Sequence, residues 1–521
     1  MLRAADSEEL GMAQVSSGPQ INHSQVHNVK PSSLLEKLIS FPAMLGTLLF
    51  GGVFWSLRMF IVDPDLWWHI KVGEGILATH HWPTTDPYSF TVAGQPWIAY
   101  EWLGEVLLGT TNRLAGIRGL DALLILLGFA VLAALYTLAT IRSGNAKAGF
   151  ATTAVLIMLA TPSFSLRPQM LGYLFLILTL IALELFRQGK RTALWFLPAL
   201  FLLWVNSHGS FVVGMGAIAA YYVGGLWEFR TGDIESRRWL PAERQQLSLV
   251  FLLCLIALTI TPYGTRLATY PFDMAFSQPI NVANIQEWMP MPFNLPGGKL
   301  FLALLLGFVL AQATLRLKWR PDEFALFLFG TAMACLHLRF ILIFVPFFAP
   351  LLATIFARWT PPYSRAKDLF VANAVIMALV AGAMIYYFPS KAKLEESVSH
   401  TYPVKAVAYL RQHPAPGPMF NNYGFGGYLI WAMGPEHKVF LDGRGDVYER
   451  GGVLADYLHI AYLKPGAFGV LRNYGIQSCL VERNEALATA LGNSPEWKKV
   501  YSDDLSVLFV RKGPAETAQL N

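Results

Sequence analysis

Two carboxylates, two indoles, an imidazole and an ammonium group follow the first long apolar segment, within the stretch Val62–Lys71. Asp65 and His69 are four residues apart, so on a helix they share one face. Ionisable groups near hydrocarbon are costly unless they are solvated, paired or bound, so in a membrane protein they indicate a functional site. A plainer interpretation, a helix cap with a proline in the first turn and two interfacial aromatic anchors, also fits Asp63, Pro64, Trp67 and Trp68.

Further polar side chains stand at the ends of later apolar segments. If successive segments cross a membrane in alternation, these side chains fall on one side, whereas the opposite loops hold mainly lysine, arginine and turn residues. We therefore expect one site there, with Asp63, Asp65 and Glu101 as catalytic residues. For His208 a purely structural role fits equally well. The expected substrate-binding residues are His69, Arg167, Asn206, His208, Glu287, Arg339, Asp442 and Arg444.

The composition places this site in a membrane protein. Of 521 residues, 54% are hydrophobic and only 14% are charged, which excludes an ordinary soluble enzyme. A membrane-spanning helix needs about 20 largely apolar residues. We therefore predict a polytopic α-helical membrane protein with about 11 transmembrane helices, at 41–62, 120–141, 149–162, 170–186, 193–205, 211–229, 247–261, 300–315, 323–335, 340–356 and 369–388.

The basic residues predict the orientation. The net charge is +6, but lysines and arginines are spread over many loops and not gathered on one helix, so nucleic acid is not an expected partner. With the N-terminus in the cytoplasm, the inner loops are rich in lysine and arginine and the outer loops hold few. Eleven spans then carry the C-terminal region outside. We expect a multi-pass protein of a bacterial inner membrane.

Three regions follow from these patterns. Residues 1–38 are predicted to be a disordered cytoplasmic tail, because they are rich in Ser, Gln, His and Asn and lack the apolar core of a signal peptide. Residues 39–389 form the transmembrane region with a large outer loop at 63–118, and residues 390–521 form a soluble extracytoplasmic α/β domain. Neither a disulfide framework nor a cysteine metal site is expected from Cys254, Cys335 and Cys479.

The large outer loop is predicted to contain two helices and a turn. The first helix spans 63–79, and the prolines within 80–90 prevent it from continuing. The second begins near Tyr100 and places Glu101 and Glu105 one turn apart on one face.

The C-terminal region is predicted to be a small α/β unit. Its strand at 438–441 ends in Asp442-Gly443-Arg444, which places a carboxylate and a guanidinium where α/β sheets commonly bind ligands. A tight turn with a surface ion pair is the alternative. The glycine-rich segment 420–431 permits tight turns or close backbone approach but matches no phosphate loop. The other expected elements are helices at 404–411 and 485–491 and strands at 478–482, 498–501 and 505–511.

Several short motifs resemble those of the GT-C class of integral membrane glycosyltransferases, which use polyprenyl-phosphate-linked sugars outside the cytoplasm. Asp63-Pro64 followed by Trp68-His69 is similar to an element in the first outer loop of oligosaccharyltransferase catalytic subunits. Glu101-Trp102-Leu103 stands where protein mannosyltransferases and aminoarabinose transferases carry His-Pro-Pro-Leu. Asn421-Asn422-Tyr423-Gly424 resembles a degenerate oligosaccharyltransferase acceptor motif, Trp-Trp-Asp-Tyr-Gly. The architecture matches from Phe41 onward and looks closest to uncharacterised bacterial GT-C-like membrane proteins.

The resemblance implies an inverting glycosyltransferase that moves a sugar from a polyprenyl-phosphate-linked membrane donor to an extracytoplasmic lipid, glycan or protein. Such a transfer passes through an oxocarbenium-like state, so it needs a carboxylate to take the acceptor's proton and cationic or metal groups to stabilise the departing phosphate. Asp63 or Asp65 could be the base, and both could bind Mg²⁺ or Mn²⁺. Arg167, His208 or Arg339 could contact the phosphate.

Two departures limit what the resemblance carries over. Gln169 stands where many GT-C enzymes keep an acid, so the metal ligand set is incomplete, and the missing tryptophans and aspartate of the acceptor motif argue against peptide-sequon recognition. Two other functions stay open. A transporter or flippase would need charges inside the spans, where we find almost none beyond Glu184. A non-catalytic GT-C-like scaffold that binds a lipid-linked glycan fits the same departures.

Overall fold

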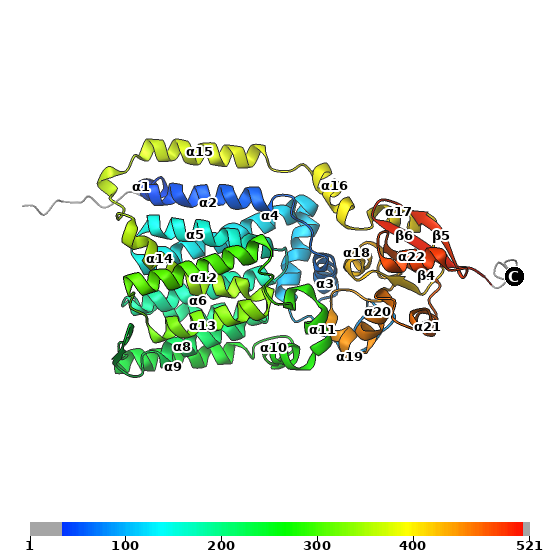
Figure 1. Ribbon diagram of the computed structural model, residues 1–521, viewed down its shortest axis with the longest axis horizontal. Coiled ribbons are helices and arrows are strands. Elements are labelled where there is room, and N and C mark those ends of the chain that lie inside the picture. Colours follow the sequence, from blue (N-terminus) through cyan, green and yellow to red (C-terminus); the bar gives the residue numbers. More distant parts are fainter. Residues whose placement is uncertain (1–33, 514–521) are drawn as a thin grey trace, which may run out of the picture.

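A computed structural model describes residues 34–513. Long helices lie side by side in a bundle, short helices cap one end of it, and a small sheet with its own helices lies beyond that end (Figure 1). The predicted tail falls outside the described residues except for Leu34–Leu38, which form helix α1.

A helix occupies each apolar segment that the sequence predicts. Among residues 34–513, four helices are long and apolar enough to cross a membrane, and the bent pair α15–α16 would be a fifth. The chain is therefore a mostly helical protein with several candidate spans, and the number of eleven stays a prediction. The bundle consists of α2 (Phe41–Leu57), α4 (Trp102–Ser143), α5 (Ala146–Ala160), α6 (Gln169–Arg187), η2 (Arg191–Phe196), α7 (Leu197–Val205), α8 (Phe211–Val223), α9 (Pro241–Ala257), α12 (Pro296–Leu315), α13 (Pro321–Leu336), α14 (Ile341–Trp359) and α15 (Phe370–Tyr386).

Buried ion pairs join helix ends at the end of the bundle that lies away from the sheet. They connect the start of α13 with the ends of α4 and α6, where each charge has a partner within 3 Å. A short hairpin, β1 (Phe229–Thr231) with β2 (Ile234–Ser236), and the turn η5 (Arg365–Lys367) also belong to the loops between bundle helices. The ion pairs are Arg320–Glu184 at 2.7 Å, Arg142–Glu323 at 2.7 Å and Arg187–Asp322 at 2.9 Å.

Short helices from four parts of the chain cap the other end of the bundle. Helix α3 lies against the first turns of α4 with the two backbones in contact, because a Cβ on Gly73 would overlap the carbonyl oxygen of Glu105 and one on Gly109 would lie 2.7 Å from Glu74 N. The capping elements are α3 (Asp65–Thr79), η1 (Thr161–Ser163), α10 (Arg266–Ser277), α11 (Pro279–Asn284), η3 (Gln286–Trp288) and η4 (Leu338–Phe340).

Two boundaries in the large outer loop differ from the prediction. Helix α3 begins at Asp65 and not at Asp63, although the Asp63 carboxylate does accept the backbone N–H of Asp65 at 3.0 Å. The second predicted helix begins at Trp102 and runs on into the following span with a break at Gly116, whose φ of 57° suits glycine.

The C-terminal sheet has the order β3-β4-β6-β5, with β3 parallel to β4 and the other pairs antiparallel. The prediction of a strand at 438–441 is wrong. This segment does not join the sheet: Val439 forms an isolated bridge to Ser89 and exchanges backbone hydrogen bonds with the outer loop. The elements are β3 (Met419–Asn421), β4 (Ser478–Glu482), β5 (Trp497–Ser502), β6 (Ser506–Arg511), α16 (Lys391–Thr401), α17 (Val404–Gln412), α18 (Tyr423–Met433), α19 (Gly445–Arg450), α20 (Val453–Ala461), α21 (Ala467–Asn473) and α22 (Ala486–Asn493).

The glycine-rich segment forms helix α18, which packs on α3. A Cβ on Gly427 would overlap the carbonyl oxygen of Pro64, and one on Gly426 would overlap that of Leu441. The glycines therefore serve close helix packing, and this contact holds the C-terminal region against the outer loop.

Candidate active site

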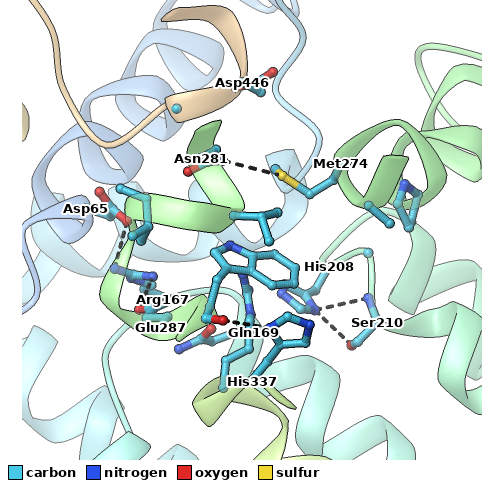
Figure 2. A pocket seen from close by; sticks show the side chains of 18 of the residues that line it. Asp65, Arg167, Gln169, His208, Ser210, Met274, Asn281, Glu287, His337 and Asp446 are labelled. Atoms are coloured by element: carbon cyan, nitrogen blue, oxygen red, sulfur yellow. Dashed lines mark hydrogen bonds and ion pairs between the residues drawn. The ribbon is translucent and has the colours of Figure 1, made fainter. Parts of the chain in front are cut away.

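A cavity of about 780 Å³ lies between the capping helices, the end of the bundle and the loop before α19. Its size suits a substantial organic ligand. Figure 2 shows its polar part, where side chains from α3, the α5–α6 loop, the α7–α8 loop and η3 point toward a common space.

One arm of the cavity is apolar. Its lining comes from α8, α13, η4 and the start of α14, and Phe329 in this lining is 44% exposed, so the arm includes a residue at the surface of the bundle. Its apolar lining comes from Val212, Val213, Phe329, Met333, Phe340 and Ile343.

Arg167 holds three carboxylates at the polar part of the cavity (Figure 2). Its Nε lies 2.6 Å from Asp63 Oδ2, its Nη2 lies 2.7 Å from Asp65 Oδ2, and its Nη1 lies 2.8 Å from Glu287 Oε1. Burial raises the pKa of Asp65 to about 6 even though Arg167 opposes this. The pKa of Glu287 is lowered, because Arg167 and Arg339 outweigh its burial.

Glu101 lies between two imidazoles. Its Oε2 is 3.5 Å from His69 Nε2 and its Oε1 is 3.4 Å from His208 Nε2, while His69 Nδ1 lies 3.2 Å from Glu105 Oε1. Burial raises the pKa of Glu101 to about 8, against the attraction of Arg167 and Arg339.

Both histidines stay neutral near pH 7. Burial and the charge of nearby arginines lower the pKa of His69 well below its usual value and that of His208 to about 3. His208 Nδ1 lies 2.8 Å from Ser210 Oγ. Two neutral imidazoles therefore flank a carboxyl group that titrates near pH 8, an arrangement suited to proton transfer.

Arg339 is the cavity's other arginine. Its guanidinium lies 4.4 Å from the ring centre of Trp288, and it makes no ion pair or side-chain hydrogen bond with any residue in the described range 34–513. The cation–π contact orients the guanidinium while its N–H groups stay available to an anion.

The cavity's wall toward the C-terminal region holds a second polar group. The rings of Tyr100 and Tyr270 stack at 4.0 Å, and Gly443 and Asp446 line the same wall. Asp446 is only 2% exposed; its Oδ2 pairs with Arg450 at 2.7 Å, while its Oδ1 finds no hydrogen-bond partner within the described part of the chain.

Sequence comparison gives no relatives: no protein-family model and no curated protein matches this chain. Solved structures do match. The apo oligosaccharyltransferase of Archaeoglobus fulgidus aligns over 92% of this chain and 75% of that chain, with a TM-score of 0.52 and 10% identity. The same archaeal enzyme, in complex with an inhibitory peptide and a dolichol-phosphate, has a TM-score of 0.50 over the same shares at 10% identity.

The arabinofuranosyltransferase AftD from mycobacteria aligns over 93% of this chain and 42% of that chain, with a TM-score of 0.51 and 13% identity. These neighbours are GT-C glycosyltransferases. The chain has a GT-C-like fold. At such low identity the likeness concerns the fold, and the chemistry of this GT-C-like chain has to be argued from its own residues.

Most of the predicted site residues of this GT-C-like chain meet at the cavity. Asp63 does not line it but lies behind Asp65 as a partner of Arg167. Asn206 does not line it either: its amide accepts the indole N–H of Trp102 at 2.7 Å, so it positions the start of α4 and with it Glu101. The predicted residues on the cavity wall are Asp65, His69, Glu101, Arg167, His208, Glu287 and Arg339.

Asp442 and Arg444 do not reach the cavity, which corrects their predicted role in substrate binding. Both are fully buried, and Arg444 pairs with Asp442 and with Asp86 of the outer loop, each at 2.6 Å. The tyrosine hydroxyl of Tyr448 contacts both members of the pair. The network joins the outer loop to the C-terminal region.

Sequence reasoning missed the C-terminal wall of the cavity. Asp446 stands two residues after Arg444 in a segment that the sequence did single out, but only the start of α19 decides that it faces the cavity. No local signal could have paired Tyr100 with Tyr270, because Tyr100 lies just before α4 and Tyr270 lies on α10.

The predicted Mg²⁺ or Mn²⁺ site does not fit this arrangement. The carboxylates of Asp63 and Asp65 converge on a guanidinium, and within residues 34–513 no group of three or more His, Cys, Asp or Glu side chains is arranged to hold a metal ion.

Proposed function

We propose that this chain is a membrane glycosyltransferase that moves a sugar from a polyprenyl-phosphate-linked donor to an acceptor outside the cytoplasm. The lining of the cavity supports this most: an apolar arm adjoins a group of acids, neutral imidazoles and an arginine that has no ion-pair partner among residues 34–513. A lipid-linked sugar has the same division into an apolar chain, a charged phosphate and a polar ring. The similarly folded archaeal oligosaccharyltransferase was solved with a dolichol-phosphate.

Arg339 is the proposed phosphate ligand. It stands where the apolar arm meets the polar part, since Phe340 and Ile343 follow it along the chain on the arm's wall. Negative charge grows on the phosphate as the glycosidic bond breaks, so hydrogen bonds from a fixed guanidinium stabilise the transition state more than the ground state. His208 Nδ1 accepts the backbone N–H of Ser210 at 3.2 Å and its Nε2 faces Glu101 at 3.4 Å, so this neutral ring orients Glu101.

Glu101 is the proposed general base. Asp63 and Asp65 are both neutralised by Arg167, whereas Glu101 faces the cavity beside two imidazoles and, within the described part of the chain, has no arginine at ion-pair distance. In the proposed step the acceptor's oxygen forms a bond to the anomeric carbon, the phosphate leaves with the electrons of the broken C–O bond, and Glu101 takes the acceptor's proton. Attack opposite the leaving phosphate inverts the anomeric configuration.

The wall toward the C-terminal region is the proposed acceptor side. The stacked tyrosines offer an aromatic face, and the carboxylate of the buried Asp446 can accept hydrogen bonds from hydroxyl groups. Both features favour a glycan acceptor over a peptide. We propose, from the basic inner loops, that this end of the bundle faces outward from a bacterial inner membrane.

Binding of a lipid phosphate is the first test. A ligand that binds only the folded protein raises its melting temperature. Undecaprenyl phosphate is expected to stabilise the detergent-purified wild type and the control Arg238→Ala, whose exposed residue lies in the loop before α9, but to lose most of its effect in Arg339→Ala. The absence of a shift in folded wild type would contradict the proposal.

Turnover is the second test. Labelled sugars on polyprenyl phosphate, offered with candidate glycan acceptors, are expected to yield product with the wild type and far less with Glu101→Gln. Lipid binding without transfer from any donor would point to a non-catalytic scaffold. Accumulation of a solute inside proteoliposomes that contain no sugar lipid would point to a transporter.

A further inference from the structure

Three carboxylates from two distant parts of the chain converge on one guanidinium. Asp63 and Asp65 come from the start of the large outer loop, and Glu287 comes from η3, which follows α11. Arg167 lies within 2.6 to 2.8 Å of all three, one nitrogen to each (Figure 2). Convergence of acids from separate loops is the arrangement by which proteins bind hard divalent cations.

The carboxylate oxygens are already engaged. Asp63 Oδ1 accepts the backbone N–H of Asp65 at 3.0 Å, and Asp65 Oδ1 accepts the indole N–H of Trp68 at 3.1 Å. The second oxygen of each aspartate faces Arg167. A cation needs oxygen lone pairs directed at one point about 2.0 to 2.6 Å away, and here the guanidinium fills that point.

Arg167 is a fixed part of this wall. The residues around it, Phe164 and Leu166, are each 1% exposed, and Pro168 packs so closely on Gly104 that a Cβ there would lie 2.6 Å from it. The Arg167 side chain itself is only 16% exposed. A backbone anchored on both sides keeps the guanidinium between the carboxylates and does not leave it free to swing aside.

We propose that the guanidinium of Arg167 occupies the place of a divalent cation in this site, so that the protein binds no metal there and does not need one. Each of the three guanidinium nitrogens faces one carboxylate, and these charge contacts hold the start of the outer loop, the α5–α6 loop and η3 together. The claim about metal binding is independent of the proposed function, whereas the claim about metal-independent transfer rests on it.

The decisive variant is Arg167→Gln, which removes the guanidinium and leaves the carboxylates. Mn²⁺ binding to the full-length detergent-purified protein is measured by the loss of the free-ion electron paramagnetic resonance signal. The wild type is expected to show no saturable binding, whereas the variant is expected to bind one Mn²⁺ per chain saturably. Arg167→Gln with Asp65→Asn is the control that should lose the new site.

Each result decides the proposal. Saturable binding by the wild type that Asp65→Asn abolishes would overturn it. If neither the wild type nor a folded Arg167→Gln protein binds Mn²⁺, the proposal is also overturned, because the position of the Arg167 guanidinium would then not be a cation site. Arg167→Gln with Asp63→Asn, which leaves fewer unpaired charges but keeps Asp65 and Glu287 for the ion, replaces Arg167→Gln if that variant does not fold. Under the proposed function, wild-type transfer is expected to persist in EDTA; no transfer under any condition would instead reject the function.

Discussion

The backbone of Gly443 lies directly against the carboxylate of Asp65, so that a Cβ on residue 443 would overlap Asp65 Oδ1. Gly443 belongs to the loop before α19 and Asp65 begins α3, so two regions far apart in sequence meet at the acidic group. Because Asp65 is also bound by Arg167, only glycine fits at 443 without displacing that ion pair.

Gly443→Ala should therefore damage the site. The added methyl must push Asp65 away from Arg167, so we expect roughly tenfold slower transfer and a loss of about 1–3 kcal/mol of stability. The measurements are sugar transfer and the melting temperature. Gly469→Ala is the control, because its Cβ would meet only Arg472 Nη2 at 3.9 Å in helix α21. Unchanged transfer by Gly443→Ala would contradict this placement of Asp65.

The pH dependence of transfer should report Glu101. A general base acts in its ionised form, and burial raises the pKa of Glu101 to about 8, so transfer should rise with pH, reach half of its maximum near pH 8 and level off above that. Glu101→Gln should lower turnover by about 10² to 10⁴-fold and abolish this rise. A rise that persists in Glu101→Gln would assign the base to another residue.

The stability of the folded protein should also depend on the ionisation of Glu101, but it should fall as pH rises, whereas transfer should rise. Between about pH 4.5 and 8, Glu101 is protonated in the folded chain and ionised in the unfolded chain, so the folded state binds more protons and loses stability as pH rises. Glu101→Gln should therefore gain in melting temperature over wild type more at pH 8 than at pH 5. Glu485→Gln is a control: burial also raises the pKa of Glu485, to about 7, but the residue does not line the cavity, so transfer should stay unchanged.

Much of the fold follows from the hydrophobic pattern. Apolar segments placed a helix in every expected part of the bundle, and short strand-like runs placed β4, β5 and β6. The segment 438–441 has the same apolar character, but its backbone pairs with Tyr88 and Phe90 of the outer loop, and no local pattern encodes that partner. The glycines of 420–431 left tight turns and close backbone approach open, and the second is confirmed: Gly426 and Gly427 lie in helix α18, where neighbouring backbones need the space.

The site was accessible through a single rule, that ionisable residues on one side of a membrane protein converge. The rule brought together Asp65, His69 and Glu101 with residues of four later loops. It could not tell which charges satisfy each other: Arg167 and the acids were expected to bind phosphate and metal, yet they bind one another. Pairing is a property of three-dimensional distance, which spacing along the chain does not supply.

Arg444 should behave as a structural residue. Arg444→Met leaves the carboxylates of Asp86 and Asp442 buried without a cation, which should cost about 3–5 kcal/mol and lower the melting temperature strongly. Arg472→Ala is the control, since its pair with Glu496 at 3.5 Å is half-exposed and worth at most about 1 kcal/mol. A stable Arg444→Met protein with only a raised KM would restore the substrate-binding role predicted from the sequence.

Asp446 should govern the acceptor and not the donor. Asp446→Asn keeps the shape of the side chain but removes the charge of a buried carboxylate whose Oδ1 is unpartnered within residues 34–513, so the acceptor's KM should rise about tenfold, as expected for the loss of one charged hydrogen bond. The melting-temperature shift caused by undecaprenyl phosphate should stay unchanged. Asp456→Asn, whose carboxylate accepts a hydrogen bond from Tyr474 away from the cavity, is the control and should alter neither quantity.

The pKa of Asp446 predicts that the protein's affinity for the acceptor falls at low pH. Burial raises the pKa of Asp446 to about 6 although Arg450 and Arg444 oppose it, so the wild type should lose affinity for the acceptor as pH falls through 6, where the carboxylate takes up a proton. Asp446→Asn has no charge to lose, and its acceptor KM should be flat over that range. An equal acidic loss in both proteins would place the titrating group elsewhere, and an unchanged KM in Asp446→Asn would move the acceptor away from the wall that α19 forms.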